Sequence, residues 1–150
     1  MKNKQLIRFT IFFALVLIAL ISLIFIFSDN FSINPGKGNE LPDNYVINVI
    51  DGDTFQINSG EIIRLLCVDT PEKSQEGHQE AKEFLEFLIL NKEAILEHSI
   101  TDKDNYSRLL RYVYVNDSYS SELLFVNRMI LNKGYGTLFI VPPETCNEMN

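Results

Sequence analysis

The chain has 150 residues, with 13 basic and 20 acidic side chains that give a formal net charge of -7 at pH 7. A chain this acidic is not expected to bind a polyanion through bulk electrostatics, so any recognition of a phosphate polymer has to be local, through a few arginines and a bound metal. The length allows one domain of ordinary size with a single core.

An uncharged apolar segment comes first in chain order, at residues 9–27, where Thr10 and Ser22 are the only polar side chains. As a helix it would span about 28 Å, close to the hydrocarbon thickness of a bilayer. The three basic residues of the chain that precede it lie in residues 1–8, so the positive-inside rule predicts a cytoplasmic N-terminus and an extracellular remainder. We therefore expect a single-pass membrane anchor, followed by 10 basic and 20 acidic residues, a net charge of -10.

A cleaved signal peptide, giving a secreted protein, is the alternative. Its apolar region normally ends in a small-x-small cleavage site, which residues 25–28 (FIFS) do not offer. The sequence therefore favours the uncleaved anchor. Residues 28–44 are rich in Asn, Gly, Pro and Ser, the composition of a flexible linker, and residues 45–150 remain for one globular domain.

The domain is predicted to begin with three strands. Residues 45–50 form the first, and the two apolar runs on either side of Asn58-Ser59-Gly60 form a hairpin. This turn places Thr54 opposite Arg64 and Asp53 opposite Leu65, so Asp53 and Arg64 should lie close together. Asp69 would lie roughly 13 Å beyond Leu65 in a flat hairpin, and only strong coiling into a small barrel would bring it back.

The remaining predicted elements are an amphipathic helix at 75–91, a strand at 94–99, a hairpin of 109–116 with 120–127, and a short helix from the N-cap Asn127 to Asn132. This order predicts an α+β, mainly β fold: a five-stranded OB-like barrel with packed helices. Such barrels often bind nucleic acid, but the fold alone does not establish an activity.

Four strings within the domain carry chemistry, and they are VIDGDTF (49–55), RLLCVDTPE (64–72), DNYSRLLRYVYV (104–115) and VNRMILNKGYG (126–136). In this order and at these intervals, they resemble the thermonuclease (staphylococcal nuclease-like) family over about residues 45–143. The resemblance implies a Ca²⁺-dependent endonuclease that hydrolyses DNA and RNA and leaves 3′-phosphate ends.

The first two strings hold hard oxygen donors suited to Ca²⁺. These donors are the carboxylates of Asp53 and Asp69 and the backbone carbonyl of Thr70, and the resemblance assigns all three to the metal site. It also places Glu72 beside them, as the general base or as the group that orients the attacking water. Asp51 is a weaker candidate, which shapes the turn.

Two arginines form the anion-binding half of the predicted site. The guanidinium groups of Arg64 and Arg108 offer a rigid fork for pairs of phosphate oxygens, and the resemblance assigns both to the substrate phosphate and its transition state. Tyr106 occupies the place of a phosphate-contacting tyrosine in a Tyr-Gly-Arg string, but here Ser107 replaces the glycine. Arg111 is expected on the other face of the strand, in solvent.

The chain departs from the family pattern in two places. Residues 138–143 read LFIVPP where relatives often carry base-stacking tyrosines, so base stacking there is not expected to follow the family. The chain also ends before the final helix that the family packs on its barrel. A non-catalytic OB-like binding module, or a truncated inactive relic of the nuclease, is therefore the alternative function.

The two cysteines and two histidines add little from sequence alone. An oxidising exterior would permit a disulfide between Cys67 and Cys146, but the preferred interpretation is a buried thiol and a free thiol near the chain end. His78 and His98 lie on different elements and form no ligand cluster, so both are expected to be at the surface or partly packed.

Overall fold

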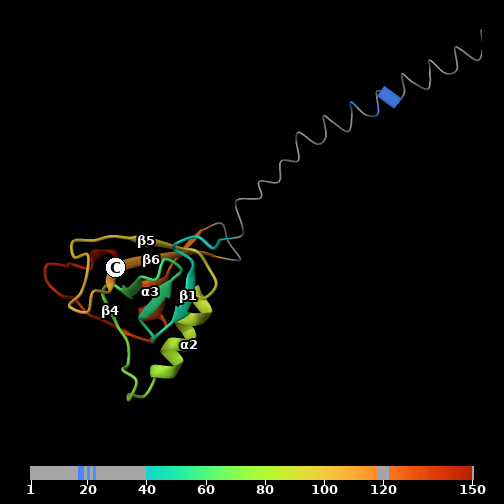
Figure 1. The fold of residues 1–150 in the computed structure, drawn as a ribbon. Helices are drawn as coiled ribbons and strands as arrows, with labels where there is room; N and C mark the ends of the chain where they lie inside the picture. Colours follow the sequence, from blue (N-terminus) through green and yellow to red (C-terminus); the bar gives the residue numbers. More distant parts are fainter. Residues whose placement is uncertain (1–16, 19, 21, 23–39, 118–121, 150) are drawn as a thin grey trace, which may run out of the picture. The chain divides into compact units, whose positions relative to one another are not determined.

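The computed structural model describes residues 17, 18, 20, 22, 40–117 and 122–149 (Figure 1). The basic flank 1–8 lies outside the described residues, as do most of the apolar segment 9–27 and residues 28–39 of the expected linker. Residues 17, 18, 20 and 22 are helical. No helix within the described residues has both the length and the apolar character needed to cross a bilayer. The chain divides into two units, Met1–Glu40 and Leu41–Asn150.

The second unit is built on one mixed sheet. Its hydrogen-bonded path runs through β1 (Val46–Val49), β2 (Thr54–Ile57), β3 (Ile62–Leu65), β6 (Leu109–Asn116) and β5 (Ala94–Glu97), and β7 (Leu123–Phe125) pairs with the end of β6. Among the described strands of this sheet, β3 and β6 are the one parallel pair, and the other neighbours are antiparallel. A bridge between Tyr45 and Glu93 joins the start of β1 to the start of β5. The α+β class is therefore confirmed, and the bridge closes the five-strand path as a barrel.

The β2–β3 hairpin has the predicted register. Thr54 lies opposite Arg64, and the Leu65 amide donates to the Asp53 carbonyl at 2.8 Å. Because side chains alternate along a strand, Ile63 and Leu65 are buried in the core while Arg64 points to the other face. The same alternation that fills the barrel thus presents the arginine outside it.

The third predicted strand is wrong in its extent. β3 ends at Leu65, the chain turns at Leu66 and Cys67, and a separate short strand, β4 (Val68–Asp69), pairs with β8 (Thr137–Leu138). Cys67 takes a left-handed φ of 64° at this turn. A sharp turn, as well as barrel coiling, therefore redirects the chain so that Asp69 approaches the first hairpin.

Two helices pack on the sheet. Helix α2 (His78–Ile89) begins three residues later than predicted, because Gly77 before it takes a left-handed φ of 88°. Its buried face carries Ala81, Leu85, Leu88 and Ile89. The second helix, α3 (Val126–Asn132), lies beside α2 and β6 (Figure 1). Both helices contribute to one core with Phe55, Ile63, Leu65, Val113 and Ile130.

Asn127 is not an N-cap, contrary to the prediction. It lies inside α3 and is fully buried. Its side-chain oxygen accepts from the Val113 amide at 2.8 Å, and its Nδ2 donates to the carbonyls of Leu66 at 2.9 Å and Arg111 at 3.1 Å. The residue therefore joins α3 to the turn after β3 and to β6.

The preferred interpretation of the cysteines as thiols is also wrong. Cys67 and Cys146 form a disulfide, with Cα atoms 5.9 Å apart. The bond ties the turn between β3 and β4 to the segment just before a 3₁₀ helix, η1 (Asn147–Met149). The two residues are 79 positions apart, so only the fold reveals that they meet.

Candidate active site

The site begins at the loop between β1 and β2. Asp53 is only 4% exposed, and its amide donates to Asp51 Oδ1 at 3.1 Å, so the first aspartate shapes the turn as predicted. A Cβ on Gly52 would lie 2.7 Å from both Ala81 Cβ and Thr70 Oγ1. The loop therefore requires glycine because α2 and the chain after β4 pack directly against it.

The carboxylate of Asp53 organises the residues around it. Thr70 donates to Asp53 Oδ2 from its amide at 3.1 Å and from its hydroxyl at 3.2 Å, while the Thr54 hydroxyl donates to Oδ1 at 2.9 Å. These bonds fasten the end of β4 to the start of β2. Residues that lie 17 positions apart in the sequence thus become neighbours, as the predicted metal site requires.

Arg64 bridges the two predicted metal-binding aspartates. Its Nη1 forms an ion pair with Asp53, and its Nη2 donates to Asp69 Oδ1 at 2.9 Å. Burial acts to lower the pKa of Arg64, but the charges and hydrogen bonds of the two carboxylates raise it above its usual value. The two carboxylates therefore pair with one guanidinium group, that of Arg64.

Arg108 approaches from the start of β6. Its Nε donates to Asp104 Oδ2 at 2.6 Å, and its Nη1 donates to the Thr54 hydroxyl at 3.3 Å. Asp104 Oδ1 also accepts the amides of Tyr106 and Arg108. Burial acts to raise the pKa of Asp104, yet the hydrogen bonds from Arg108 and Tyr106 lower it overall. Asp104 is thus a positioning partner of Arg108 that the sequence interpretation missed.

The loop before Arg108 explains the serine in the Tyr-Ser-Arg string. Ser107 adopts a φ of 66°, the left-handed region that glycine prefers. The backbone therefore takes the shape that a glycine would favour even though a serine occupies the position. Tyr106 is 81% exposed, and its ring centroid lies 5.3 Å from the Arg108 guanidinium carbon.

A polar pocket of about 100 Å³ collects most of the predicted site residues. Its walls are formed by Asp51, Asp53, Arg64, Thr70, Pro71, Glu72 and Arg108. Asp69 adjoins this pocket through its bond to Arg64. Tyr106 instead lines a larger neighbouring pocket. The structure thus brings together both predicted arginines, the predicted base and the predicted metal ligands.

The donor chemistry around this pocket fits a hard divalent cation. Asp53, Asp69 and the carbonyl of Thr70 are oxygen donors of the type that Ca²⁺ prefers, and the two carboxylates already share one positively charged group. Across the part of the chain that the structure describes, however, no three His, Cys, Asp or Glu side chains form a ready metal cluster. Asp51 lines the same pocket, and its pKa is raised above the ordinary value mainly by burial and, to a smaller extent, by the negative charge of Asp53.

Arg111 was predicted to lie in solvent, and this is wrong. Its side chain is only 13% exposed and pairs with Asp102, with Nη2 and Oδ1 2.7 Å apart. It lines neither the polar pocket nor its larger neighbour. His78 is partly packed, with Nδ1 2.9 Å from the Pro71 carbonyl oxygen, and His98 is exposed, as predicted for both.

Comparison with known proteins identifies the family. Residues 62–149, more than half of the chain, match the family described as staphylococcal nuclease homologue, and the chain belongs to this family. The match includes Arg64, Asp69, Glu72 and Arg108, whereas Asp53 precedes it. The placement of Asp53 in the site therefore depends on the structure.

Individual relatives agree with this family. The thermonuclease of Staphylococcus hyicus is 34% identical over 88 residues, which cover 53% of this chain and 52% of the relative. The thermonuclease of Staphylococcus intermedius is 37% identical over 78 residues, 46% of each chain. An uncharacterized endonuclease of Escherichia coli is 28% identical over 92 residues, 59% of this chain and 56% of the relative. The chain thus spans about half the length of these relatives.

Proposed function

We propose that this protein is a Ca²⁺-dependent endonuclease that hydrolyses phosphodiester bonds of DNA and RNA at the polar pocket. The observation that carries this proposal is the convergence of Arg64, Arg108 and Glu72 with the two aspartates around one small polar space. The relatives named thermonuclease and endonuclease support the same reaction class.

The two arginines would bind the scissile phosphate. Arg64 and Arg108 both line the pocket, and each guanidinium can donate two parallel hydrogen bonds to phosphate oxygens. Asp104 and Thr54 fix the position of Arg108 before substrate arrives. Such preorganised donors stabilise the negative charge that develops on the phosphate oxygens in the transition state.

Glu72 is the proposed base. Its residue lines the pocket and is exposed, and its amide donates to Gln75 Oε1 at 2.7 Å, which fixes the backbone. A water held by the Glu72 carboxylate would attack phosphorus and give up its proton to that carboxylate. The bond from phosphorus to the 5′-oxygen would then break, its electron pair leaving with that oxygen, which takes up a proton from solvent water; a 3′-phosphate and a 5′-hydroxyl would remain.

Asp53, Asp69 and the carbonyl of Thr70 are the proposed ligands of Ca²⁺. Bound there, the ion would add positive charge beside the phosphate oxygens. Arg64 forms ion pairs with both carboxylates in the structure. Its positive charge therefore also offsets part of the negative charge of these two aspartates. The protein's own contribution is thus to hold two acids and two arginines within reach of one phosphate.

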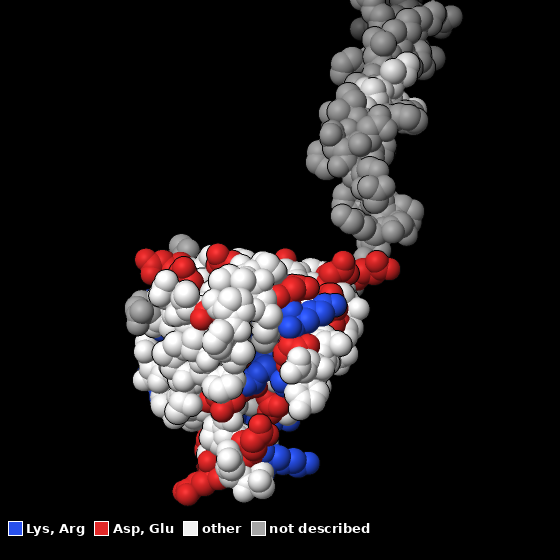
Figure 2. Space-filling model, turned by 90° about the vertical axis from the view of Figure 1, so that its left-hand side faces the viewer, with Lys and Arg blue, Asp and Glu red and all other residues white. Residues whose placement is uncertain are grey.

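A passive nucleic-acid-binding module is less well supported. Figure 2 shows acidic side chains spread over one face of the molecule, with the basic atoms on that face lying close to acidic ones. Such a surface lacks the broad positive field on which non-specific binding of nucleic acid depends. Local recognition at two arginines suits an enzyme better.

Hydrolysis by the full-length protein tests this proposal. The wild type should cleave a DNA and an RNA oligonucleotide with Ca²⁺ but not with a chelator, and Glu72→Gln should be slower by about 10² to 10⁴. Glu76→Gln, an exposed carboxylate outside the pocket, is the matched control and should retain full activity. Absence of hydrolysis by the wild type with Ca²⁺ would refute the proposal, and full activity of Glu72→Gln would remove that residue from the mechanism.

We also propose that residues 9–27 anchor the protein in the cell membrane with the nuclease domain outside, or else form a signal that is cleaved to release it. The disulfide supports an oxidising location for the domain. Both cysteines of the chain are in that bond, so a cysteine placed at Asn3 or at the exposed Ser59 supplies a unique thiol.

Labelling with a membrane-impermeant maleimide distinguishes the orientations. In intact cells it should modify Ser59→Cys but not Asn3→Cys, and the reverse pattern would contradict the anchor's orientation. Mature protein found in the medium with an N-terminus near Ser28 would show cleavage instead.

A further inference from the structure

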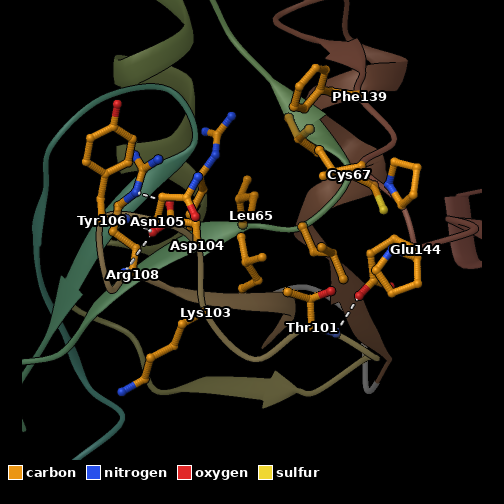
Figure 3. A pocket seen from close by; sticks show the side chains of 17 residues that line it. Leu65, Cys67, Thr101, Lys103, Asp104, Asn105, Tyr106, Arg108, Phe139 and Glu144 are labelled. Carbon is orange, nitrogen blue, oxygen red and sulfur yellow. Dashed lines mark hydrogen bonds and ion pairs between the residues drawn. The ribbon is translucent and has the colours of Figure 1, made fainter.

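A second pocket, of about 370 Å³, adjoins the polar one and shares Arg64 and Arg108 with it. One wall of this pocket is the loop of residues 103–106, and the opposite wall is the segment 139–144, which we call the wall segment. Figure 3 shows Tyr106 and Arg108 on one side and Phe139, Cys67 and Glu144 on the other. Leucines at positions 65, 66 and 110 line the space between them.

The composition of this pocket suits a nucleoside. Its lining is mainly apolar, and its polar residues are the two arginines at the edge it shares with the polar pocket, residues 101 and 103–105, and Glu144. A phosphate bound to both arginines would therefore place an attached sugar and base against apolar side chains. The wall segment supplies Phe139, Val141 and two prolines to that surface.

Few core contacts hold the wall segment. Phe139, Ile140 and Val141 are each about half exposed, so burial alone does not fix their positions. At one end, β8 pairs with β4, and the Phe139 amide donates to the Cys67 carbonyl at 3.2 Å. At the other end, the segment is held by the carboxylate of its last residue, Glu144, and by the disulfide at Cys146, two positions later.

Glu144 joins the wall segment to residues 99–101, which follow β5. The residue is 6% exposed, and its carboxylate accepts the Ser99 hydroxyl at 2.7 Å and the Thr101 amide at 2.6 Å. Burial acts to raise its pKa, but these hydrogen bonds lower it overall. The carboxylate is thus an anion held in place by donors on residues 99–101, next to the opposite wall.

The disulfide anchors the same segment to the catalytic side of the fold. Cys67 immediately precedes β4, which ends at Asp69, and both cysteines take left-handed φ values, 64° and 54°. A non-glycine residue adopts this conformation only where its surroundings hold it there. The hydrogen bonds of Glu144 and the disulfide at Cys146 therefore both hold this end of the wall segment.

We propose that the Cys67–Cys146 disulfide and the Glu144 carboxylate are positioning groups that hold the wall segment as a binding surface for the nucleoside beside the scissile phosphate. This inference rests on the proposed nuclease function. Arg64 and Arg108 are fixed by Asp53, Asp69, Asp104 and Thr54 rather than by the wall segment. Release of the segment should therefore weaken substrate binding and leave the hydrolytic step nearly unchanged.

Steady-state kinetics of the full chain on an oligothymidylate test this separation. The double variant Cys67→Ser/Cys146→Ser and the single variant Glu144→Gln should each raise KM, the double variant by about tenfold, with kcat within about threefold of wild type. Thr145→Ala, an exposed residue between the two anchors, is the matched control and should match wild type in both constants. A fall in kcat at constant KM, or an unchanged KM in both variants, would overturn the inference.

An oligonucleotide with abasic positions flanking the scissile bond tests whether the base is what the wall segment binds. The wild type should show a raised KM on this substrate. The double variant should show nearly the same KM as wild type on it, because the contact between the base and the wall segment is already absent. If the double variant raises KM on the abasic substrate by the same factor as on the normal substrate, the wall segment does not act through the base. If the wild type cleaves neither substrate, the proposed function fails instead.

Hydrogen exchange on the same variants separates a local role from a global one. In the double variant, amides of residues 137–149 should lose protection while those of β1, β2 and β3 keep it. Loss of protection throughout the barrel would overturn the inference, because the disulfide would then hold the fold rather than the pocket.

Discussion

Replacement of the buried Asn127 by alanine should strongly destabilise the domain. The substitution removes three hydrogen bonds, one from the Val113 amide and two to the carbonyls of Leu66 and Arg111. The Arg111 carbonyl keeps the Leu66 amide as a partner at 2.9 Å, so the main loss falls on the other two groups. A buried polar group left without a partner costs about 1 to 3 kcal/mol, so the two groups together cost about 2 to 6 kcal/mol.

This loss is a large part of the roughly 5 to 15 kcal/mol that stabilises a typical domain. For a domain of this size, at about 4 °C for each kcal/mol, it corresponds to a fall in Tm of about 8 to 24 °C. Circular dichroism of the full-length protein during heating measures the change. Asn132→Ala, at the exposed end of the same helix, should melt close to wild type. A Tm for Asn127→Ala within about 3 °C of wild type would refute the reasoning, because three buried partners could not then depend on this amide.

Two further substitutions address the parts that hold the site. Asp104→Asn should lower kcat/KM about tenfold or more, because Arg108 loses the charged partner that fixes its Nε; unchanged kinetics would show that Thr54 alone positions Arg108. Since the pKa of Asp104 lies below its ordinary value of 3.8, its charged form stabilises the fold above that pH, and the stability difference between wild type and Asp104→Asn should shrink as the pH falls further. Gly52→Ala should destabilise the protein by about 1 to 3 kcal/mol in urea unfolding, because the new Cβ would collide with Ala81 and Thr70; a wild-type midpoint would mean that the loop can move aside.

Local patterns were enough to predict the first hairpin and the residues it presents. A turn at Asn58-Ser59-Gly60 fixes which residues face each other, so the pairing of Thr54 with Arg64 followed from the sequence. Alternation along β3 then separated the core residues from the arginine. The closed path of five strands also followed, because the order and lengths of the apolar runs suit one kind of small barrel.

Features that depend on contacts between distant segments could not be predicted in the same way. Asn127 looked like a cap because asparagine favours that position, but the fold instead provides three buried backbone partners for its amide. Arg111 looked solvated because the sequence does not show that Asp102 lies beside it. The approach of Cys67 to Cys146 likewise follows from the turn after β3 and the return of the chain through β8.

The central claim is that Asp53, Arg64, Asp69, Glu72 and Arg108 act as one phosphodiesterase site, and two arginine-to-lysine substitutions test it most directly. Lysine keeps the charge but loses the planar fork, and the two positions differ in that Arg108 lines the polar pocket while Arg111 pairs with Asp102 outside it. With Ca²⁺ and a saturating DNA oligonucleotide, we expect Arg108→Lys to lose about 10² to 10³ in kcat and Arg111→Lys to stay within about threefold of wild type. Equal losses in the two variants, at equal Tm, would contradict the claim that the polar pocket is where the phosphate is hydrolysed.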